Sequence, residues 1–409
     1  MKRLLSLLLS LCMLVVPLTA RAEWLYEQES GETPESLILA TEAELWQSAS
    51  VPTAADGLDI QAKGAVLMEL STGTLLYEQD SHTPMPIASV TKIMTLLLIF
   101  EAIENGRLTL EDVVTCSGTA AAYGGSQIWL EEGEQMTVHD LLKAIAVVSA
   151  NDACAMMAEH LSGSVDAFVA QMNARAEQLG MTDTHFKDCC GLDDTAVSSA
   201  ADVAVMTREL LRHQAVTNYT TIWMDTLRDG QSQLVNTNKL VRYYKGATGM
   251  KTGTTSGAGY CLSATAERDG VAMCAVVLGS DTTDHRFAGA RQLLDYGFAN
   301  YTVYTPSVDV GQMEPVPVLR GVERQVALTV RPMEPLLLKK GEESLVGYRV
   351  TLAENVEAPV LEGQTLGKVE VLLGETAVAT YPILAACAVE RMTVGKAFSR
   401  LLTALLGGH

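Results

Sequence analysis

The chain has 409 residues, a length that allows two domains, with 29 Lys and Arg against 49 Asp and Glu. The formal net charge of −20 at pH 7 argues against nucleic acid as a partner, because an acidic surface repels phosphate. Any anionic substrate must therefore meet a local cation.

The first 22 residues predict a secretory signal peptide. Lys2 and Arg3 precede an apolar run from Leu4 to Leu18, and Ala20-Arg21-Ala22 offers small residues at a cleavage site. A membrane span is disfavoured because the run is short and contains a proline. Removing the three basic residues of this segment leaves 26 basic against 49 acidic residues, a net charge of −23. We expect an exported protein.

Residues 23–60 read as an acidic linker, with nine Asp or Glu and no Lys or Arg. The seven cysteines beyond the signal peptide are odd in number and irregularly spaced, and no C-x-x-C pair occurs. This pattern predicts no zinc site and no disulfide framework, so we expect most of these cysteines to be small buried apolar residues. Neither a metal nor a cofactor is expected.

The segment from Pro86 to Thr95 places Ser89 and Lys92 three residues apart, at the head of an apolar run from Ile93 to Phe100. In a helix these two side chains lie one turn apart on the same face. A lysine at hydrogen-bond distance can take the proton of an attacking serine, provided that burial or a second cation keeps the amine neutral. Taken alone, this spacing is also common at a solvent-facing helix start.

Residues 61–305 predict one α+β domain. A hairpin is expected over residues 64–78 and a second over residues 249–278, because apolar residues alternate there on either side of glycine turns. Between them, apolar residues recur at helical spacing, and residues 286–301 predict a closing helix. Strands at both ends of a helical middle imply a sheet built from chain-distant halves.

Residues 306–388 show short alternating runs and predict a small all-β domain, which we interpret as a spacer or docking module. The tail, residues 389–409, is amphipathic and too short and charged to span a bilayer. A helix lying in the membrane interface fits it better than a helix packed on the β domain. Its apolar face and basic residues are Val394, Phe398, Leu401 and Leu405, with Arg391, Lys396 and Arg400.

Two further motifs follow the serine–lysine pair: Ser149-Ala150-Asn151 between two helical stretches, and Lys251-Thr252-Gly253 on a strand. In this order and on these elements, the three motifs resemble those of the penicillin-recognising serine enzymes. The segments around them resemble the D-alanyl-D-alanine carboxypeptidases, which are low-molecular-mass penicillin-binding proteins, over about residues 61–301. The resemblance implies a β-lactamase/transpeptidase-like domain, followed by the β-rich domain and the amphipathic helix.

The resemblance also implies a role for each motif residue. Ser89 attacks the carbonyl between the terminal D-alanines of a peptidoglycan stem peptide, Lys92 takes its proton, and water releases the acyl-enzyme. β-Lactam antibiotics acylate the same serine. The expected remaining roles are proton relay by Ser149, amide binding by Asn151, carboxylate binding by Lys251 and Thr252, room for a substrate strand at Gly253, and an oxyanion hole from the backbone N–H groups of Ser89 and Thr254.

Three alternatives stay open. A class A β-lactamase shares the motifs, but its E-x-x-L-N loop is missing, since no Leu-Asn pair occurs in the chain. A transpeptidase differs only in its acceptor, and an idle cell-wall-binding scaffold would not need the intact motifs. The sequence departs from the family at residues 193–199, near which a histidine is common, and at Ala150, where glycine is usual.

Overall fold

The computed structural model describes residues 57–406 and divides the chain into two compact units, Met1–Ala299 and Asn300–His409. The predicted signal peptide and nearly all of the predicted acidic linker lie outside the described residues. Within residues 57–406, no helix has both the length and the apolar character needed to cross a membrane.

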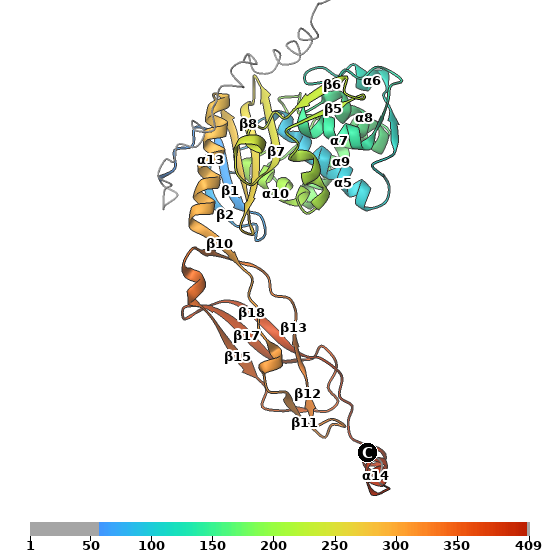
Figure 1. Cartoon of the computed structure of the whole chain (residues 1–409), viewed down its shortest axis with the longest axis vertical. Coiled ribbons are helices and arrows are strands. Elements are labelled where there is room, and N and C mark those ends of the chain that lie inside the picture. The colour runs from blue at the N-terminus through green and yellow to red at the C-terminus, as the bar shows by residue number, and fades with distance from the viewer. Residues whose placement is uncertain (1–56, 407–409) are drawn as a thin grey trace, which may run out of the picture. The chain divides into compact units, whose positions relative to one another are not determined.

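The first unit is built on a five-stranded antiparallel sheet, with strand order β2-β1-β9-β8-β7. Strand β1 pairs with β9, about 200 residues further along the chain, so the sheet does join chain-distant halves. Strand β7 lies at one edge (Figure 1). The strands are β1 Gly64–Glu69, β2 Leu75–Gln79, β7 Ala247–Thr255, β8 Gly259–Arg268 and β9 Val271–Ser280.

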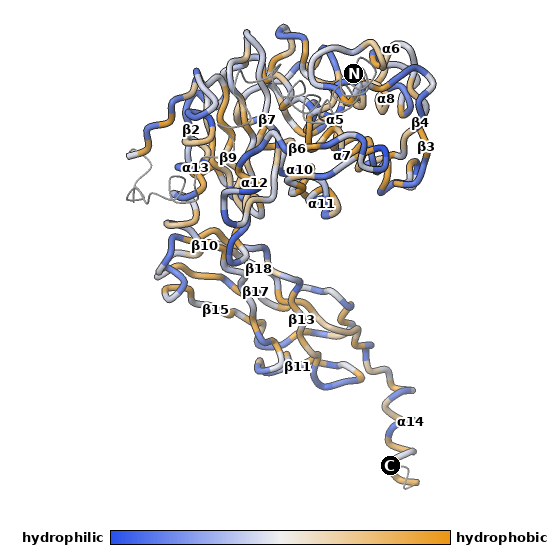
Figure 2. The backbone as a smooth tube through the Cα atoms, turned by 45° about the horizontal axis from the view of Figure 1, so that its top comes forward, coloured by the Kyte–Doolittle hydropathy of each residue, from blue (hydrophilic) through white to orange (hydrophobic). Residues whose placement is uncertain are grey.

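Both faces of this sheet are covered, which explains the apolar run in β9. Met273 and Val277 point to helix α13 (Thr283–Asn300), where Gly297 and Gly289 allow close approach. Cys274, on the opposite face, contacts Ser263 beside helix α10 (Ala200–Leu210). Figure 2 shows the apolar character of this strand.

The helical middle is as predicted, with two additions. Its main helices are α5 Lys92–Glu104, α7 Val138–Val147, α8 Asn151–Ser162, α9 Val165–Gln178 and α10. Two small two-stranded antiparallel sheets not expected from the sequence also occur: β3 Val113–Thr115 with β4 Gln135–Thr137, and β5 Met224–Leu227 with β6 Ser232–Val235. Short helices are α6 Gly118–Ala121, α11 Thr217–Thr220 and α12 Leu240–Tyr243.

The second unit is all-β apart from its last helix, and its first strand, β10 (Tyr301–Tyr304), pairs with β14 (Leu336–Lys339). The unit therefore begins at Asn300, whereas the sequence placed its start at residue 306. A four-stranded sheet has the order β13-β18-β17-β15. The other strands are β11 Val316–Leu319, β12 Gln325–Val326, β13 Leu328–Val330, β15 Val346–Leu352, β16 Val356–Glu357, β17 Thr365–Leu373 and β18 Thr376–Ala385.

The predicted tail helix is α14, Val394–Leu405, and Thr393 caps its first turn. Apolar and polar residues alternate along it (Figure 2). None of its residues is buried, and the four residues of the predicted apolar face are 60–89% exposed. The helix therefore does not bury its apolar face on the β-rich unit.

Candidate active site

The serine–lysine pair lies where a 3₁₀ turn runs into helix α5. The turn spans Ala88–Thr91, and α5 begins at Lys92. Side chains three residues apart eclipse one another in a 3₁₀ helix, which brings lysine directly over serine. Lys92 Nζ donates to Ser89 Oγ at 2.8 Å. Ala88 has φ +48°, a strained backbone conformation next to the serine.

Lys92 is fully buried and its amine has two further acceptors. Nζ lies 2.6 Å from Asn151 Oδ1 and 3.0 Å from the carbonyl oxygen of Cys190. Asn151 Nδ2 in turn donates to the carbonyl of Gly124 at 2.8 Å. These contacts fix the direction of the amine, because each acceptor belongs to a different segment of the chain. The structure thus joins Ser89, Lys92 and Asn151 in one network.

Ser149 forms the strained turn before helix α8. Its φ is +65°, a left-handed conformation that is costly for serine. Its Oγ is buried and has no hydrogen-bond partner within residues 57–406. Asp152, one residue after Asn151, joins the first turn of α8 to residues 128–130 by accepting from the backbone N–H groups of Ile128 and Leu130. Burial raises the pKa of Asp152, and these N–H groups oppose that shift.

The third motif lies on the edge strand β7. Lys251 is 1% exposed and Nζ donates to the carbonyl of Thr252, whose hydroxyl donates to Thr237 Oγ1 at 2.7 Å. A Cβ on Gly253 would lie 2.7 Å from the carbonyl oxygen of Ile87 and 2.9 Å from the backbone nitrogen of Ser89. The missing side chain of Gly253 therefore lets β7 abut the turn that carries Ser89. Room for a substrate strand at Gly253 stays a prediction.

Arg286, from helix α13, fixes β7 from behind and was not identified from the sequence. Its guanidinium is 8% exposed, and Nη1 donates toward three oxygens: the carbonyls of Gly253 (3.3 Å) and Cys261 (3.4 Å) and the hydroxyl of Thr254 (3.1 Å). In the sequence, a buried arginine at this position of the helix cannot be distinguished from an exposed one. The contact stabilises the strand segment that faces Ser89.

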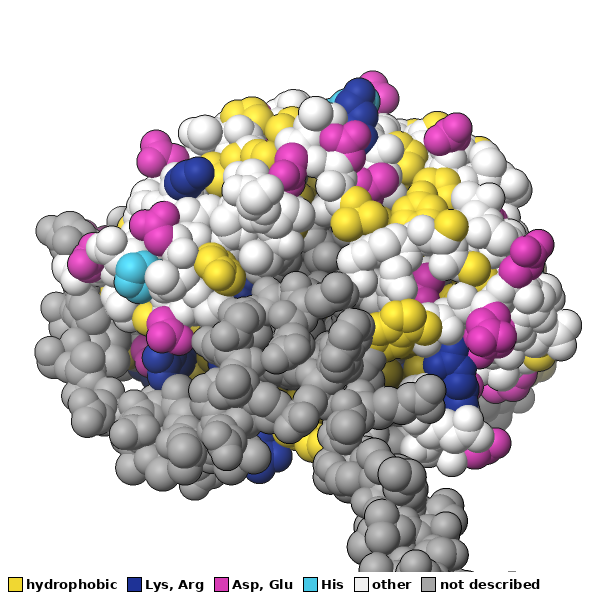
Figure 3. Space-filling model, turned by 90° about the horizontal axis from the view of Figure 1, so that it is seen from above, with side chains coloured by type: hydrophobic (Ala, Val, Ile, Leu, Met, Phe, Trp, Pro, Cys, Tyr) yellow, Lys and Arg dark blue, Asp and Glu magenta, His cyan; other side chains and the backbone are white. Residues whose placement is uncertain are grey.

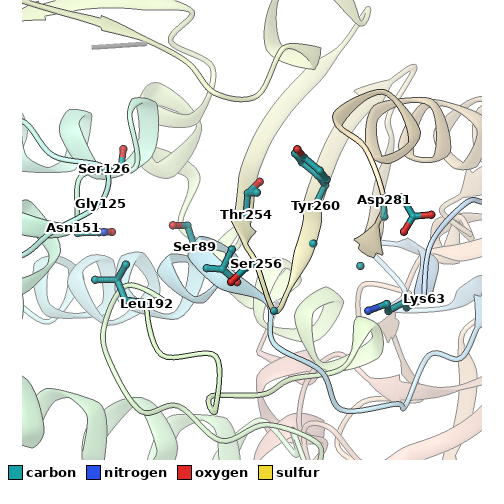
Figure 4. Close-up of a pocket in the computed structure, with 16 residues that line it drawn as sticks. Lys63, Ser89, Gly125, Ser126, Asn151, Leu192, Thr254, Ser256, Tyr260 and Asp281 are labelled. Atoms are coloured by element: carbon teal, nitrogen blue, oxygen red, sulfur yellow. The ribbon is translucent and has the colours of Figure 1, made fainter. Parts of the chain in front are cut away.

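A cleft of about 640 Å³ opens over these residues (Figure 4). Of the predicted site residues, Ser89, Asn151 and Thr254 line it, while Lys92, Ser149, Lys251, Thr252 and Gly253 lie behind its wall. Ser126 and Leu192 form the side near Asn151, and Tyr260 lies on the other side of Ser89. A cleft of this volume can hold a peptide segment against the serine.

The loop after Phe186, which supplies the Cys190 carbonyl, is organised by Asp188. Its carboxylate accepts the backbone N–H groups of four consecutive residues: Cys190 (2.6 Å), Gly191, Leu192 (2.9 Å) and Asp193 (2.7 Å). A second carboxylate, Asp194, accepts from Thr255 Oγ1 and from Gly257 N, so it ties this loop to the end of β7.

Replacing Asp188 by alanine is expected to lower acylation of Ser89 by about 10- to 100-fold. Without the carboxylate, four backbone N–H groups lose their acceptor, and the loop no longer fixes the Cys190 carbonyl that holds Lys92. Stopped-flow measurement of benzylpenicillin acylation tests this. Asp166→Ala, an exposed carboxylate in the first turn of α9, is the matched control. An acylation rate within twofold of wild type would contradict the role assigned to Asp188.

The basic side chains of the site are buried: Lys92, Lys251 and Arg286 are at most 8% exposed. Carboxylates outnumber basic side chains on the described part of the face in Figure 3.

Of the seven cysteines in residues 57–406, six are buried, which confirms the predicted burial. Burial raises the pKa of Cys261 to about 11. Such thiols are not nucleophiles at neutral pH. Among the described residues, no cluster of His, Cys, Asp and Glu could hold a metal.

Comparison with known proteins agrees with this geometry. The family model described as D-alanyl-D-alanine carboxypeptidase matches residues 48–282, and that of the penicillin-binding protein 5 C-terminal domain matches residues 301–391. The D-alanyl-D-alanine carboxypeptidase DacF of Bacillus subtilis is 41% identical over 75% of this chain and 80% of its own length.

Solved structures give the same result. Penicillin-binding protein 5 from Haemophilus influenzae is 31% identical, with a TM-score of 0.71 over 82% of this chain and 99% of that one. Penicillin-binding protein D2 from Listeria monocytogenes, solved in an ampicillin-bound form, is 33% identical, with a TM-score of 0.55 over 59% of this chain and 99% of that one. The chain belongs to the D-alanyl-D-alanine carboxypeptidase family, the low-molecular-mass penicillin-binding proteins.

Proposed function

We propose that the chain removes the terminal D-alanine of peptidoglycan stem peptides through an acyl-enzyme on Ser89. The observation that carries this is the 2.8 Å contact between Ser89 Oγ and the buried amine of Lys92. In the attacking state the amine is neutral: two N–H bonds go to Asn151 and Cys190, and the lone pair faces the serine proton. The serine oxygen bonds to the peptide carbonyl carbon as its proton moves to Nζ.

The other motif residues act on the rest of the substrate. The backbone N–H groups of Ser89 and Thr254 donate to the carbonyl oxygen as it becomes negative. The hydroxyl of Ser149, unpartnered in the described residues, relays a proton to the leaving nitrogen, so that D-alanine departs as an amine. Lys251 supplies positive charge for the terminal carboxylate, with the hydroxyl of Thr252 as donor. Water then hydrolyses the ester and restores the serine.

Two measurements test the proposal. Release of D-alanine from diacetyl-L-lysyl-D-alanyl-D-alanine, with and without an amine acceptor, separates hydrolysis from transpeptidation. Mass spectrometry after benzylpenicillin treatment should find one adduct, on the peptide that contains Ser89. An adduct elsewhere, or no release of D-alanine, would reject the mechanism and favour a scaffold. Fast hydrolysis of a chromogenic cephalosporin would instead indicate a β-lactamase.

We also propose that the chain is exported and rests on the outer face of the cytoplasmic membrane through α14. The export signal is the predicted signal peptide, residues 1–22. The exposed apolar face of α14 and its Lys396 and Arg400 suit an interfacial helix on anionic lipid. No acidic residue lies within the helix, although the whole chain is acidic.

Replacing both Phe398 and Leu405 by aspartate is expected to lower binding to phosphatidylglycerol vesicles by at least about tenfold, because two charges enter the apolar face. Co-sedimentation measures this. Ser399→Asp with Thr403→Asp, which adds two charges to the same helix outside its apolar face, is the control for charge alone. Equal binding by all three proteins would contradict a membrane role for α14.

A further inference from the structure

The segment 191–194 contacts both walls of the active-site cleft. Leu192 lies on the side of Asn151 (Figure 4). A Cβ on Gly125, which lines the same side, would lie 3.3 Å from Leu192 Cδ2, so the leucine packs closely against this glycine. Asp194, two residues further on, accepts hydrogen bonds from the other wall, at the end of β7 and the turn after it. The segment therefore joins the two walls.

The same segment abuts the turn that carries Ser89. Gly191 has φ +82°, and a Cβ there would lie 1.9 Å from the carbonyl oxygen of Ala88, so only glycine fits. The carbonyl of Cys190, one residue earlier, accepts from the amine of Lys92 at 3.0 Å. A shift of this segment would therefore move groups on which the serine–lysine pair depends.

Asp194 holds the end of β7 with both of its carboxylate oxygens. Oδ1 accepts from the hydroxyl of Thr255, the last residue of β7, and Oδ2 accepts from the backbone N–H of Gly257 at 3.1 Å. The Thr255 hydroxyl in turn accepts from the N–H of Ala258 at 3.0 Å. A charged acceptor strengthens such bonds. One side chain, 61 residues from Thr255 in the sequence, thus fixes this turn.

Gly257 makes room for the carboxylate. A Cβ at this position would lie 2.5 Å from Asp194 Oδ2 and 2.7 Å from its Cγ, closer than real Cβ contacts. The φ of Gly257 lies outside the left-handed region, so alanine can adopt its backbone conformation. Gly257→Ala therefore breaks the contact with Asp194 while it keeps both the charge and the N–H donor.

The fixed turn follows directly after an oxyanion donor of the proposed mechanism. The backbone N–H of Thr254 belongs to the residue before Thr255, and β7 is an edge strand that pairs only with β8 in the five-stranded sheet. An edge strand has no second neighbour to hold its backbone groups in place. Oxyanion donors are effective only when they are aligned before the reaction. This part of β7 therefore needs contacts from elsewhere in the fold.

We propose that Asp194 is a positioning residue for acylation: by fixing the end of β7, it holds the Thr254 N–H in register with that of Ser89. Asp194 itself does not line the cleft, so it acts through Thr255 and Gly257. The role rests on the proposed acyl-enzyme on Ser89. Because the oxyanion develops only in the transition state, loss of the contact should slow acylation without weakening the initial complex.

Benzylpenicillin acylation, measured over a range of concentrations, separates the saturating rate constant from the dissociation constant of the initial complex. Asp194→Ala should lower the rate constant by about 30-fold, somewhat less than the outright loss of a donor, and should leave the dissociation constant within about threefold. Asp194→Asn keeps one acceptor oxygen and should lie between. Asp193→Ala is the matched control, because Asp193 accepts from Thr195 within its own loop, and it should keep the wild-type rate.

Gly257→Ala tests the same contact from the other side. It should lower the rate constant by a similar factor, although no charge is removed. In the Asp194→Ala background the added methyl group no longer meets a carboxylate, so it should slow acylation by less than about threefold more. Fully additive losses in the double variant, or an Asp194→Ala rate within threefold of wild type, would overturn the proposal.

Mass spectrometry of the completed reaction separates positioning from misfolding. Positioning predicts one adduct per chain in each variant, formed slowly. A reduced adduct stoichiometry with a wild-type rate constant would show that Asp194 only stabilises the fold, and would overturn the role. If the wild-type chain itself forms no adduct on Ser89, the proposed function is overturned. If the wild-type adduct forms but its rate does not depend on Asp194, only the positioning role is overturned.

Discussion

Replacing Lys92 by methionine is expected to slow benzylpenicillin acylation of Ser89 by about 10³-fold, the scale of losing a general base. The reason is geometric. The amine lies 2.8 Å from the serine oxygen and is buried, so no water can replace it. Methionine keeps an unbranched chain of similar length and fills the same space. Stopped-flow acylation and D-alanine release should fall together.

The fold should survive this substitution. The change leaves Asn151 Oδ1 and the Cys190 carbonyl without the lysine donor, at about 1–3 kcal/mol each, but it also removes a buried amine. Lys143→Met is the matched control: Lys143 is 8% exposed and donates to the carbonyl of Thr226. It should cost stability without slowing acylation, while Ser89→Ala should abolish the adduct. Acylation by the Lys92 variant at a rate near wild type would assign the serine proton to another base.

The serine–lysine contact could be predicted from the sequence because it is local. Two side chains three residues apart meet in any helical turn, and the structure only adds that the turn is 3₁₀. The sequence also predicts that Lys251 lies on a strand and that the sheet joins chain-distant halves, because both predictions depend on patterns within short windows. The two small two-stranded sheets could not be predicted, because strands of three or four residues carry too little alternation.

The contacts that shape the site around this pair left no such pattern. The third acceptor of the Lys92 amine is a backbone carbonyl 98 residues away, and every residue type carries one. Arg286 and Asp188 are single charged residues whose importance comes from what the fold places beside them. Gly253 was singled out, but the sequence could not tell which neighbour its missing side chain admits. Long-range packing decides that question.

Replacing Gly253 by alanine is expected to lower acylation and D-alanine release by at least about 100-fold, with the fold retained. A methyl group there would lie within 3.0 Å of the backbone nitrogens of Ser89 and Val90, closer than real Cβ contacts. Neither partner is a flexible side chain, so strand β7 must move away from the serine turn. That movement separates the N–H groups of Ser89 and Thr254, the two donors of the proposed oxyanion hole.

The control is Gly347→Ala, at a strand glycine with nothing within 4 Å of the added methyl group. It should leave both rates unchanged, because the substitution is sterically free. Thermal unfolding then distinguishes a local shift from a general loss of structure: the Gly253 variant should keep a single cooperative transition near that of wild type. If it acylated within threefold of the wild-type rate, the two backbone donors could not depend on the close approach of β7, and the oxyanion hole would have to lie elsewhere.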